Sequence, residues 1–268
     1  MPIRFNVPHR GVHTTAPAAA NSHTIMSVHS GQEFILNRVS SLLLVHGAWH
    51  GPWAWQSLVE QLPDIDIHTV SLPSSGNDAA ALGDLYDDAA VVKAAVAAID
   101  GPVVVVAHSY GGAPVTEALG AADNVRRLVY LAAFQPDVGD SLFSTAGGVA
   151  PPWWEVHERA ELKGKGYIKP SQPREVFYGD VDPETAEQAV GRLGLQAWAS
   201  TQQPLTQAAW HTIPSTYIVC EADNALPPFA QELMAKRAER VLRMNSSHSP
   251  FLSQPSELAT LISGELSA

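Results

Sequence analysis

The residue best placed to do chemistry is a serine between small residues, directly after an apolar run. The run Val103–Val106 leads into residues 107–112, which have the sequence AHSYGG. A small-x-Ser-x-Gly pattern after a buried strand predicts a sharp strand-to-helix turn that lifts the Ser109 hydroxyl above the end of a sheet. Small neighbours allow the close backbone approach that this turn needs, although Ala107 stands where glycine is more usual. The predicted chemistry is acyl transfer through a covalent serine intermediate; the alternative is a serine in an ordinary loop.

A serine hydroxyl becomes a good nucleophile when a base takes its proton and a carboxylate orients that base. His248 is the predicted base, because it lies between the last apolar run and the last helical pattern of the chain. Asp223 is the predicted carboxylate, because it closely follows the preceding apolar run. Asp137 and Glu221 are the alternatives for this carboxylate.

Acyl transfer also needs two backbone N–H donors for the negative charge that forms on the carbonyl oxygen. Tyr110 is expected to supply one, because it follows the nucleophile at the N-terminus of a helix. Ala48 is expected to supply the other, from the loop 46–51 (HGAWHG) after the first apolar run. His46 and His108 adjoin these loops, and we interpret them as structural neighbours.

The elements that must position these residues alternate along the chain. Apolar, β-branched runs predict strands at 42–45, 65–70, 103–106, 125–131, 216–220 and 240–244. Between and after them, helical patterns lie at 53–62, 82–99, 112–119, 228–237 and 255–262. This alternation predicts an α/β fold, a mostly parallel sheet with helices on both faces. Continuous apolar runs are typical of strands that are covered on both faces.

One stretch breaks the alternation. Between about residues 136 and 214 there is no convincing strand pattern, and about 75 residues are too many for a bare loop. We therefore expect a mainly helical cap at 136–211, inserted into a core formed by 41–135 and 212–268. Aromatic residues on and near the cap are expected to line an apolar pocket, although each is equally consistent with packing inside the cap; they are Trp49, Phe134, Trp153, Trp154 and Trp198.

Composition limits the partners. The 268 residues carry a net charge of −11, which argues against nucleic acid or an anionic membrane as the main partner. No apolar stretch approaches the roughly 18 to 20 residues that span a bilayer. We expect a cytoplasmic protein that binds a small molecule.

The single cysteine, Cys220, excludes an intramolecular disulfide. The sequence leaves the oligomeric state open, and a homodimer is one option.

The first 40 residues differ from the rest. Met1–Gln32 contains no Asp or Glu but holds two arginines and four histidines. Such a composition resembles a targeting segment, but the apolar core of a secretory signal is missing. The histidines lack metal-ligand spacing. We interpret residues 1–40 as an N-terminal extension of the core, with Met26 as an alternative start.

Four motifs together resemble the α/β-hydrolase superfamily. They are VHGAWHGxWxW at 45–55, AHSYGG at 107–112, YIVCEAD at 217–223 and SHSPFLSQP at 247–255. The chain is most similar to the small carboxylesterase branch that includes plant methyl-ester esterases and hydroxynitrile lyases, over about residues 41–266. The resemblance implies an α/β-hydrolase fold with a cap between strands. It also implies the triad Ser109, Asp223 and His248, in the chain order of that superfamily, and Ala48 and Tyr110 as oxyanion donors.

Two departures from the lyases narrow the expected activity. The lyases carry a lysine after the catalytic histidine, where this chain has Ser249, and they prefer a cysteine at the position of Tyr110. We therefore expect a serine carboxylic-ester hydrolase acting on a small or medium apolar or aryl ester, without metal or organic cofactor. The alternatives are other chemistry on the same triad (hydroxynitrile lyase, perhydrolase, amidase or cofactor-free oxygenase) and a non-catalytic small-molecule receptor.

Overall fold

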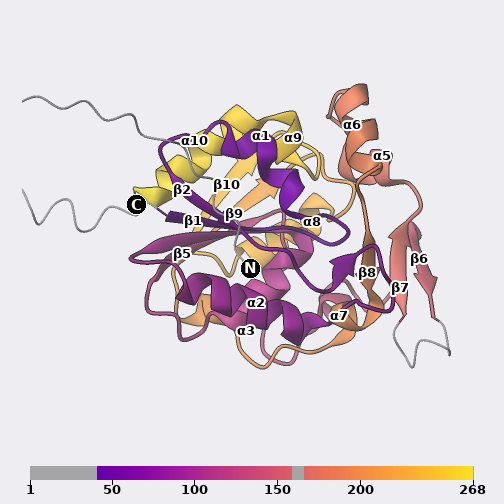
Figure 1. Cartoon of the computed structure of the whole chain (residues 1–268), viewed down its shortest axis with the longest axis horizontal. Helices are drawn as coiled ribbons and strands as arrows, with labels where there is room; N and C mark the ends of the chain where they lie inside the picture. The colour runs from indigo at the N-terminus through magenta and orange to yellow at the C-terminus, as the bar shows by residue number, and fades with distance from the viewer. Residues whose placement is uncertain (1–40, 159–165, 268) are drawn as a thin grey trace, which may run out of the picture.

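A six-stranded parallel sheet forms the centre of the molecule, as described for residues 41–158 and 166–267 by a computed structural model (Figure 1). The strand order is β10-β9-β5-β4-β1-β2. The bounds are β1 Ser41–Val45, β2 Asp66–Thr69, β4 Val103–His108, β5 Val125–Leu131, β9 Ser215–Cys220 and β10 Arg240–Met244. Every end lies within two residues of the predicted one. Each neighbouring pair of these strands is parallel, so the predicted sheet is confirmed. The extension 1–40 and Met26 lie outside the described residues.

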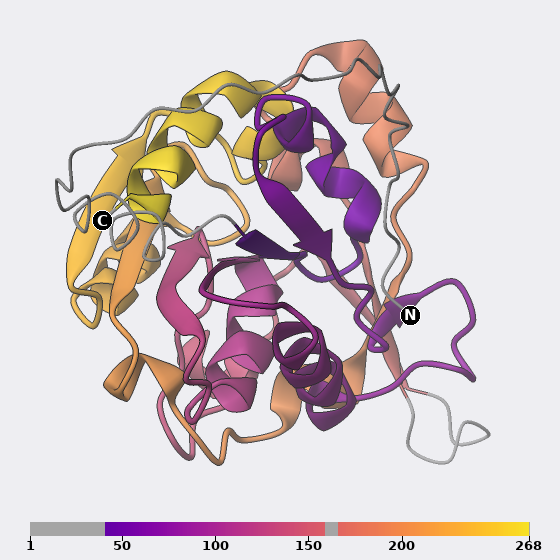
Figure 2. The ribbon, with the colours of Figure 1, turned by 60° about the vertical axis from the view of Figure 1, so that its left-hand side comes forward.

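Helices cover both faces of this sheet, as predicted. One layer consists of η1 Pro52–Trp55, α1 Gln56–Val59, α9 Pro250–Ser253 and α10 Pro255–Leu266. The opposite face is covered by α2 Leu85–Ala97, α3 Gly112–Ala118 and α8 Pro228–Ala235. Figures 1 and 2 show α1 and α10 on one side of the strands and α2 and α3 on the other. None of the helices in the described part of the chain has both the length and the apolar character needed to cross a bilayer.

Alternate residues of each strand pack against the two layers of helices. Leu42 and Leu44 of β1 pack in the same cluster as Phe251 of α9. Their neighbours Leu43 and Val45 belong to the cluster that includes α2 and α3. Side chains on successive strand residues point to opposite faces, and here both faces are buried. This is why the strands are apolar throughout rather than alternately polar.

The long helix α2 begins at a capping box. The Asp84 carboxylate accepts hydrogen bonds from the backbone N–H groups of Tyr86 and Asp87, and Asp87 returns a bond to the Asp84 N–H. Such caps satisfy the free donors of a helix N-terminus. Gln203 adds a contact from the cap, because its Oε1 accepts from Leu85 N at 2.9 Å and its Nε2 donates to Asp84 at 2.9 Å.

The segment between β5 and β9 forms the cap, which lies beside the carboxyl ends of the central strands (Figure 1). Its helices are α4 Leu142–Thr145, α5 Pro173–Phe177, α6 Pro183–Val190, α7 Trp198–Gln202 and the 3-10 turn η4 Ala209–His211. Helices thus make up most of its regular structure, as expected.

The expectation that this segment lacks strands is wrong. A four-stranded antiparallel sheet has the order β3-β8-β7-β6. Its strands are β3 Ser75–Gly76, β6 Trp154–His157, β7 Tyr167–Pro170 and β8 Leu195–Ala197. The strands are too short for a period-2 pattern to be recognised, and β3 comes from the core, between β2 and α2. The small sheet therefore joins the cap to the core.

Candidate active site

Ser109 lies on a strained turn between β4 and α3. Its φ of +53° is in the left-handed region, which a residue with a Cβ rarely adopts. Glycines after it permit the turn, because a Cβ on Gly111 would lie 2.6 Å from the carbonyl oxygen of His46 and one on Gly112 would lie 1.9 Å from that of Phe134. Phe134 N donates to Ser109 O at 3.0 Å. Strain of this kind persists only where the surroundings enforce it.

His248 and Asp223 form a buried pair at the ends of β10 and β9. His248 Nδ1 lies 2.7 Å from Asp223 Oδ2, and both side chains are almost fully buried. The second carboxylate oxygen accepts from the backbone N–H groups of Ala225 and Leu226, at 2.7 and 2.9 Å. Gln231 on α8 donates to Oδ2 at 2.9 Å. The carboxylate therefore has several donors, and the Nε2 atom of the imidazole stays available.

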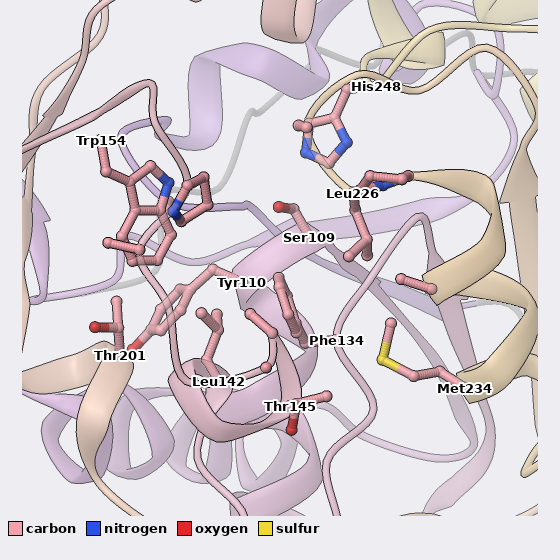
Figure 3. Close-up of a pocket in the computed structure, with 18 of the residues that line it drawn as sticks. Ser109, Tyr110, Phe134, Leu142, Thr145, Trp154, Thr201, Leu226, Met234 and His248 are labelled. Carbon is pink, nitrogen blue, oxygen red and sulfur yellow. The ribbon is translucent and has the colours of Figure 1, made fainter.

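The structure brings Ser109 and His248 to the same cavity, which has a volume of about 840 Å³. In Figure 3 the His248 ring lies directly above the Ser109 hydroxyl. The two other acids considered from the sequence lie elsewhere. Asp137 pairs with His211 at 3.1 Å, and Glu221 is exposed. Of the three, Asp223 is the one that contacts His248.

A buried histidine determines the direction of the Ala48 N–H. His46 Nε2 accepts from Leu72 N at 3.1 Å, so its proton is on Nδ1, which donates to the carbonyl oxygen of Gly47 at 2.8 Å. In a trans peptide the N–H points opposite to the carbonyl, so Ala48 N–H points away from His46. Burial lowers the pKa of His46 to about 4, which keeps the ring neutral. Ala48 itself lines the cavity.

Two further neutral histidines hold carbonyl groups of the site. His50 Nδ1 donates to the oxygen of Ala48 at 2.8 Å, and the Tyr178 hydroxyl binds its Nε2 at 2.8 Å. His108 Nε2 donates to the backbone oxygen of His248 at 2.9 Å. Burial lowers the pKa of His50 to about 3 and that of His108 well below its usual value.

Within 41–158 and 166–267, no group of three or more His, Cys, Asp or Glu side chains could hold a metal ion.

Trp49 follows Ala48 in a second strained conformation, with a φ of +63°. The cap holds it at three points. Trp49 N donates to Gln196 Oε1 at 3.3 Å, its indole Nε1 donates to the oxygen of Ile168 at 2.8 Å, and its own carbonyl accepts from Gly194 N at 2.8 Å. Sequence reasoning missed these contacts, since they join residues far apart in the chain.

Aromatic rings form one wall of the cavity. Trp49, Trp153 and Trp154 pack edge to face, with centroids 5.6 to 6.0 Å apart. These three and Phe134 line the cavity, and their role in substrate binding stays a prediction. Trp198 is not among the lining residues. Its ring packs behind Trp154 with a centroid distance of 6.1 Å, so it supports the wall from the cap side.

The opposite wall runs outward along α8 to an apolar rim. Ala230 and Met234, one helical turn apart, line the inner part, and Figure 3 shows Met234 on the far side of Ser109 from Trp154. Phe229 and Leu233 lie beside them and are 72% and 60% exposed, while Val149 faces the same cavity and is 73% exposed. Three large apolar side chains at the mouth are a feature that the sequence did not reveal.

Comparison with known proteins identifies the family. A model of the alpha/beta hydrolase family matches residues 42–261. The chain belongs to this family. It is therefore a hydrolase with the α/β-hydrolase fold that the four motifs predict.

The relatives of this hydrolase include esterases. The alpha/beta hydrolase nvfD of Aspergillus novofumigatus is 31% identical over 238 residues, which cover 83% of this chain and 94% of that protein. Methylesterase 18 of Arabidopsis thaliana is 27% identical over 245 residues, covering 81% and 93%. The crystal structure of a pyrethroid hydrolase from Sphingobium faniae superposes with a TM-score of 0.74 at 22% identity, covering 86% and 98%. That structural likeness concerns the fold.

Proposed function

We propose that the protein is a serine carboxylic-ester hydrolase that cleaves apolar esters. One observation carries the proposal: a buried imidazole that contacts a carboxylate at 2.7 Å opens on the same cavity as Ser109. Ser109 is the proposed nucleophile, His248 the base and Asp223 the carboxylate that orients it. This division of roles is that of a Ser-His-Asp triad. The esterases among the relatives support it.

In the acylation step, Ser109 Oγ attacks the ester carbonyl carbon while His248 Nε2 takes the hydroxyl proton. Asp223 stabilises the imidazolium, because its Oδ2 accepts from Nδ1. The former carbonyl oxygen becomes negative and accepts hydrogen bonds from the N–H groups of Ala48 and Tyr110. When the C–O bond to the alcohol breaks, His248 returns its proton to the departing oxygen. Ser109 then carries the acyl group as an ester.

In the deacylation step, water takes the place of the alcohol. His248 Nε2 removes a proton from that water, whose oxygen attacks the acyl carbon, and the same two N–H groups again stabilise the oxyanion. Collapse breaks the bond to Ser109 Oγ, which recovers its proton from His248. The products are a carboxylic acid and the free enzyme.

The walls favour an apolar substrate. Indoles of Trp153 and Trp154 offer flat surfaces for an aryl group, while α8 offers an aliphatic groove that leads to Phe229 and Leu233 at the rim. The volume of about 840 Å³ is in the range of cavities that enclose a drug-sized ligand. We propose esters with one aryl part and one alkyl part, divided between the two walls.

The direct test is turnover of p-nitrophenyl esters graded by acyl length, with Ser109→Ala and the matched control Ser144→Ala. Ser144 also lines the cavity but lies on α4. Turnover that is lost in the first variant and kept within about threefold in the second supports the proposal. A fluorophosphonate probe should label Ser109 in the wild type, as read by peptide mass spectrometry. Full activity of Ser109→Ala would overturn the proposal.

A further inference from the structure

A buried polar network lies behind the proposed oxyanion hole. Asp88 of α2 accepts from the backbone N–H of Ser74 at 2.8 Å, from the Ser74 hydroxyl and from the Tyr110 hydroxyl at 2.6 Å. All three side chains are at most 1% exposed. Figure 3 shows the Tyr110 ring running away from Ser109 toward Thr201. The side chain of one proposed donor residue, which lines the cavity, is thus anchored by Asp88 of α2.

Gln196 of the cap strand β8 joins this network to Trp49, which follows the other donor residue, Ala48. Its Nε2 donates to the hydroxyls of Ser74 at 2.8 Å and Ser200 at 2.7 Å. Its Oε1 accepts from the Ser75 hydroxyl at 2.6 Å and from Trp49 N at 3.3 Å. All four hydrogen-bonding positions of the carboxamide are therefore used, and the side chain is fully buried. A buried amide whose donors and acceptors are all hydrogen-bonded has one preferred orientation.

The contact to Trp49 acts on the strained part of the oxyanion loop. Trp49 has a φ of +63°, and without its cap contacts the backbone would relax toward negative φ. Such a rotation would move the Ala48–Trp49 peptide, which adjoins the Gly47–Ala48 peptide that carries the Ala48 N–H, and would strain the position that His46 gives to that N–H. His50 holds the carbonyl end of that same peptide and Gln196 holds its N–H end. The peptide is therefore fixed from both the core and the cap.

We propose that Gln196 is a positioning residue for catalysis, which holds Ala48 N–H in the oxyanion hole and ties it through Ser74 and Asp88 to Tyr110. This inference rests on the proposed ester hydrolysis, in which both N–H groups stabilise a negative oxygen. Gln196 touches neither the substrate nor the reacting atoms. It makes the cap part of the catalytic geometry as well as part of the pocket wall.

The expected effect is on the transition state and not on ground-state binding. Loss of one oxyanion donor lowers kcat by about 10² to 10³, so a displaced donor should cost about 10- to 100-fold. KM for a short ester should stay within about threefold, because Gln196 itself does not line the cavity. Affinity for a trifluoromethyl ketone, which forms a tetrahedral oxyanion on Ser109, should fall by the same factor as kcat/KM.

The experiment compares Gln196→Met with Gln203→Met in the full-length protein. Gln203 is the matched control, since it is also a cap glutamine whose Oε1 accepts a core backbone N–H, that of Leu85, away from the cavity. Thermal unfolding is measured for both. We expect the first variant alone to lose kcat and ketone affinity, while both lose stability. Gln196→Asn, which is polar but too short to reach Trp49, provides the same comparison if the methionine variant does not fold.

Three outcomes would overturn the inference. Either Gln196 variant could keep kcat and ketone affinity within twofold of the wild type while turnover still depends on Ser109. That result would overturn the positioning role of Gln196 and leave the proposed ester hydrolysis standing. Gln203→Met could lose as much kcat as Gln196→Met, which would make the effect one of general stability. Absence of any Ser109-dependent turnover in the wild type would overturn the proposed function, and the positioning role with it.

Discussion

Replacing Asp223 by asparagine should reverse the tautomer of His248. The oxygen of the new amide is expected to stay with Ala225 N and Leu226 N, which require an acceptor. Its NH₂ group then faces His248 Nδ1 and Gln231 Nε2, where the carboxylate accepted two hydrogen bonds. An NH₂ group donates only, so Nδ1 must become the acceptor and the imidazole proton moves to Nε2. Protonated Nε2 cannot take the proton of Ser109.

The magnitude follows from this tautomer. In a triad of this kind the wrong tautomer lowers kcat by about 10⁴, which corresponds to about 5 kcal/mol of transition-state stabilisation at 1.36 kcal/mol per tenfold change. The free energy of unfolding should fall by less than the transition-state stabilisation. Gln231 Nε2 keeps its bonds to the oxygens of Cys220 and Leu226, so we expect a loss of about 1 to 3 kcal/mol in the free energy of unfolding, as for one buried charge-assisted bond.

The assay is stopped-flow hydrolysis of p-nitrophenyl acetate, with urea unfolding in parallel. Asp137→Asn and Glu221→Gln serve as controls, because they alter the two other acids considered from the sequence, neither of which contacts His248. Both should retain kcat within about twofold. Asp223→Asn with kcat within tenfold of the wild type, or a larger loss in Asp137→Asn, would refute the assignment of the carboxylate.

Three further changes test the structure. Gly112→Ala puts a Cβ 1.9 Å from the oxygen of Phe134, so we expect the free energy of unfolding, measured in urea, to fall by about 4 kcal/mol or more. The control Gly264→Ala, with open space around the new Cβ, should leave that free energy unchanged or raise it. Phe229→Ala should lower kcat/KM for a p-nitrophenyl octanoate about tenfold, through lost apolar contact at the rim, and leave the acetate unchanged; equal effects on both esters would contradict the groove. Burial raises the pKa of Asp88 from 3.8 to about 7. Between these two pH values the folded protein holds a proton on Asp88 that the unfolded chain releases. The free energy of unfolding therefore falls as the pH rises through this range. Asp88→Asn should reduce this fall between pH 5 and 7.5, as measured by urea midpoints; an unchanged slope would contradict it.

The sequence was most informative where chemistry has a local signature. The turn at Ser109 needs small residues within three positions, and the loop at Ala48 has its own HG motif. Apolar runs that are buried on both faces predict the six central strands without reference to partners. Asp223 and His248 could be proposed from the sequence because each lies shortly after the end of such a strand. These features depend on neighbours in the chain, so a single sequence is enough to recognise them.

Features that depend on distant partners could not be predicted in this way. Strand β3 has two residues and β8 has three, so neither shows a period. β3 is a strand because it pairs with β8, and β8 pairs with both β3 and β7. Gln196 is an ordinary polar residue in the sequence, and its four hydrogen bonds come from three segments, at Trp49, at Ser74 and Ser75, and at Ser200. Phe229 fits an amphipathic helix, and its position over the cavity mouth depends on the cap. The sequence therefore underestimated both the strands of the cap and its contacts with the oxyanion loop.

The long separation between the contacts of the site has a consequence for folding. The bond from His108 to the carbonyl of His248 joins residues 140 positions apart, and that from Trp49 to Gln196 spans 147. Contacts across such loops form slowly, since closing them costs chain entropy. A growing chain contains the serine turn long before it contains the base. Recovery of turnover is therefore a stricter measure of complete refolding than recovery of the helical signal.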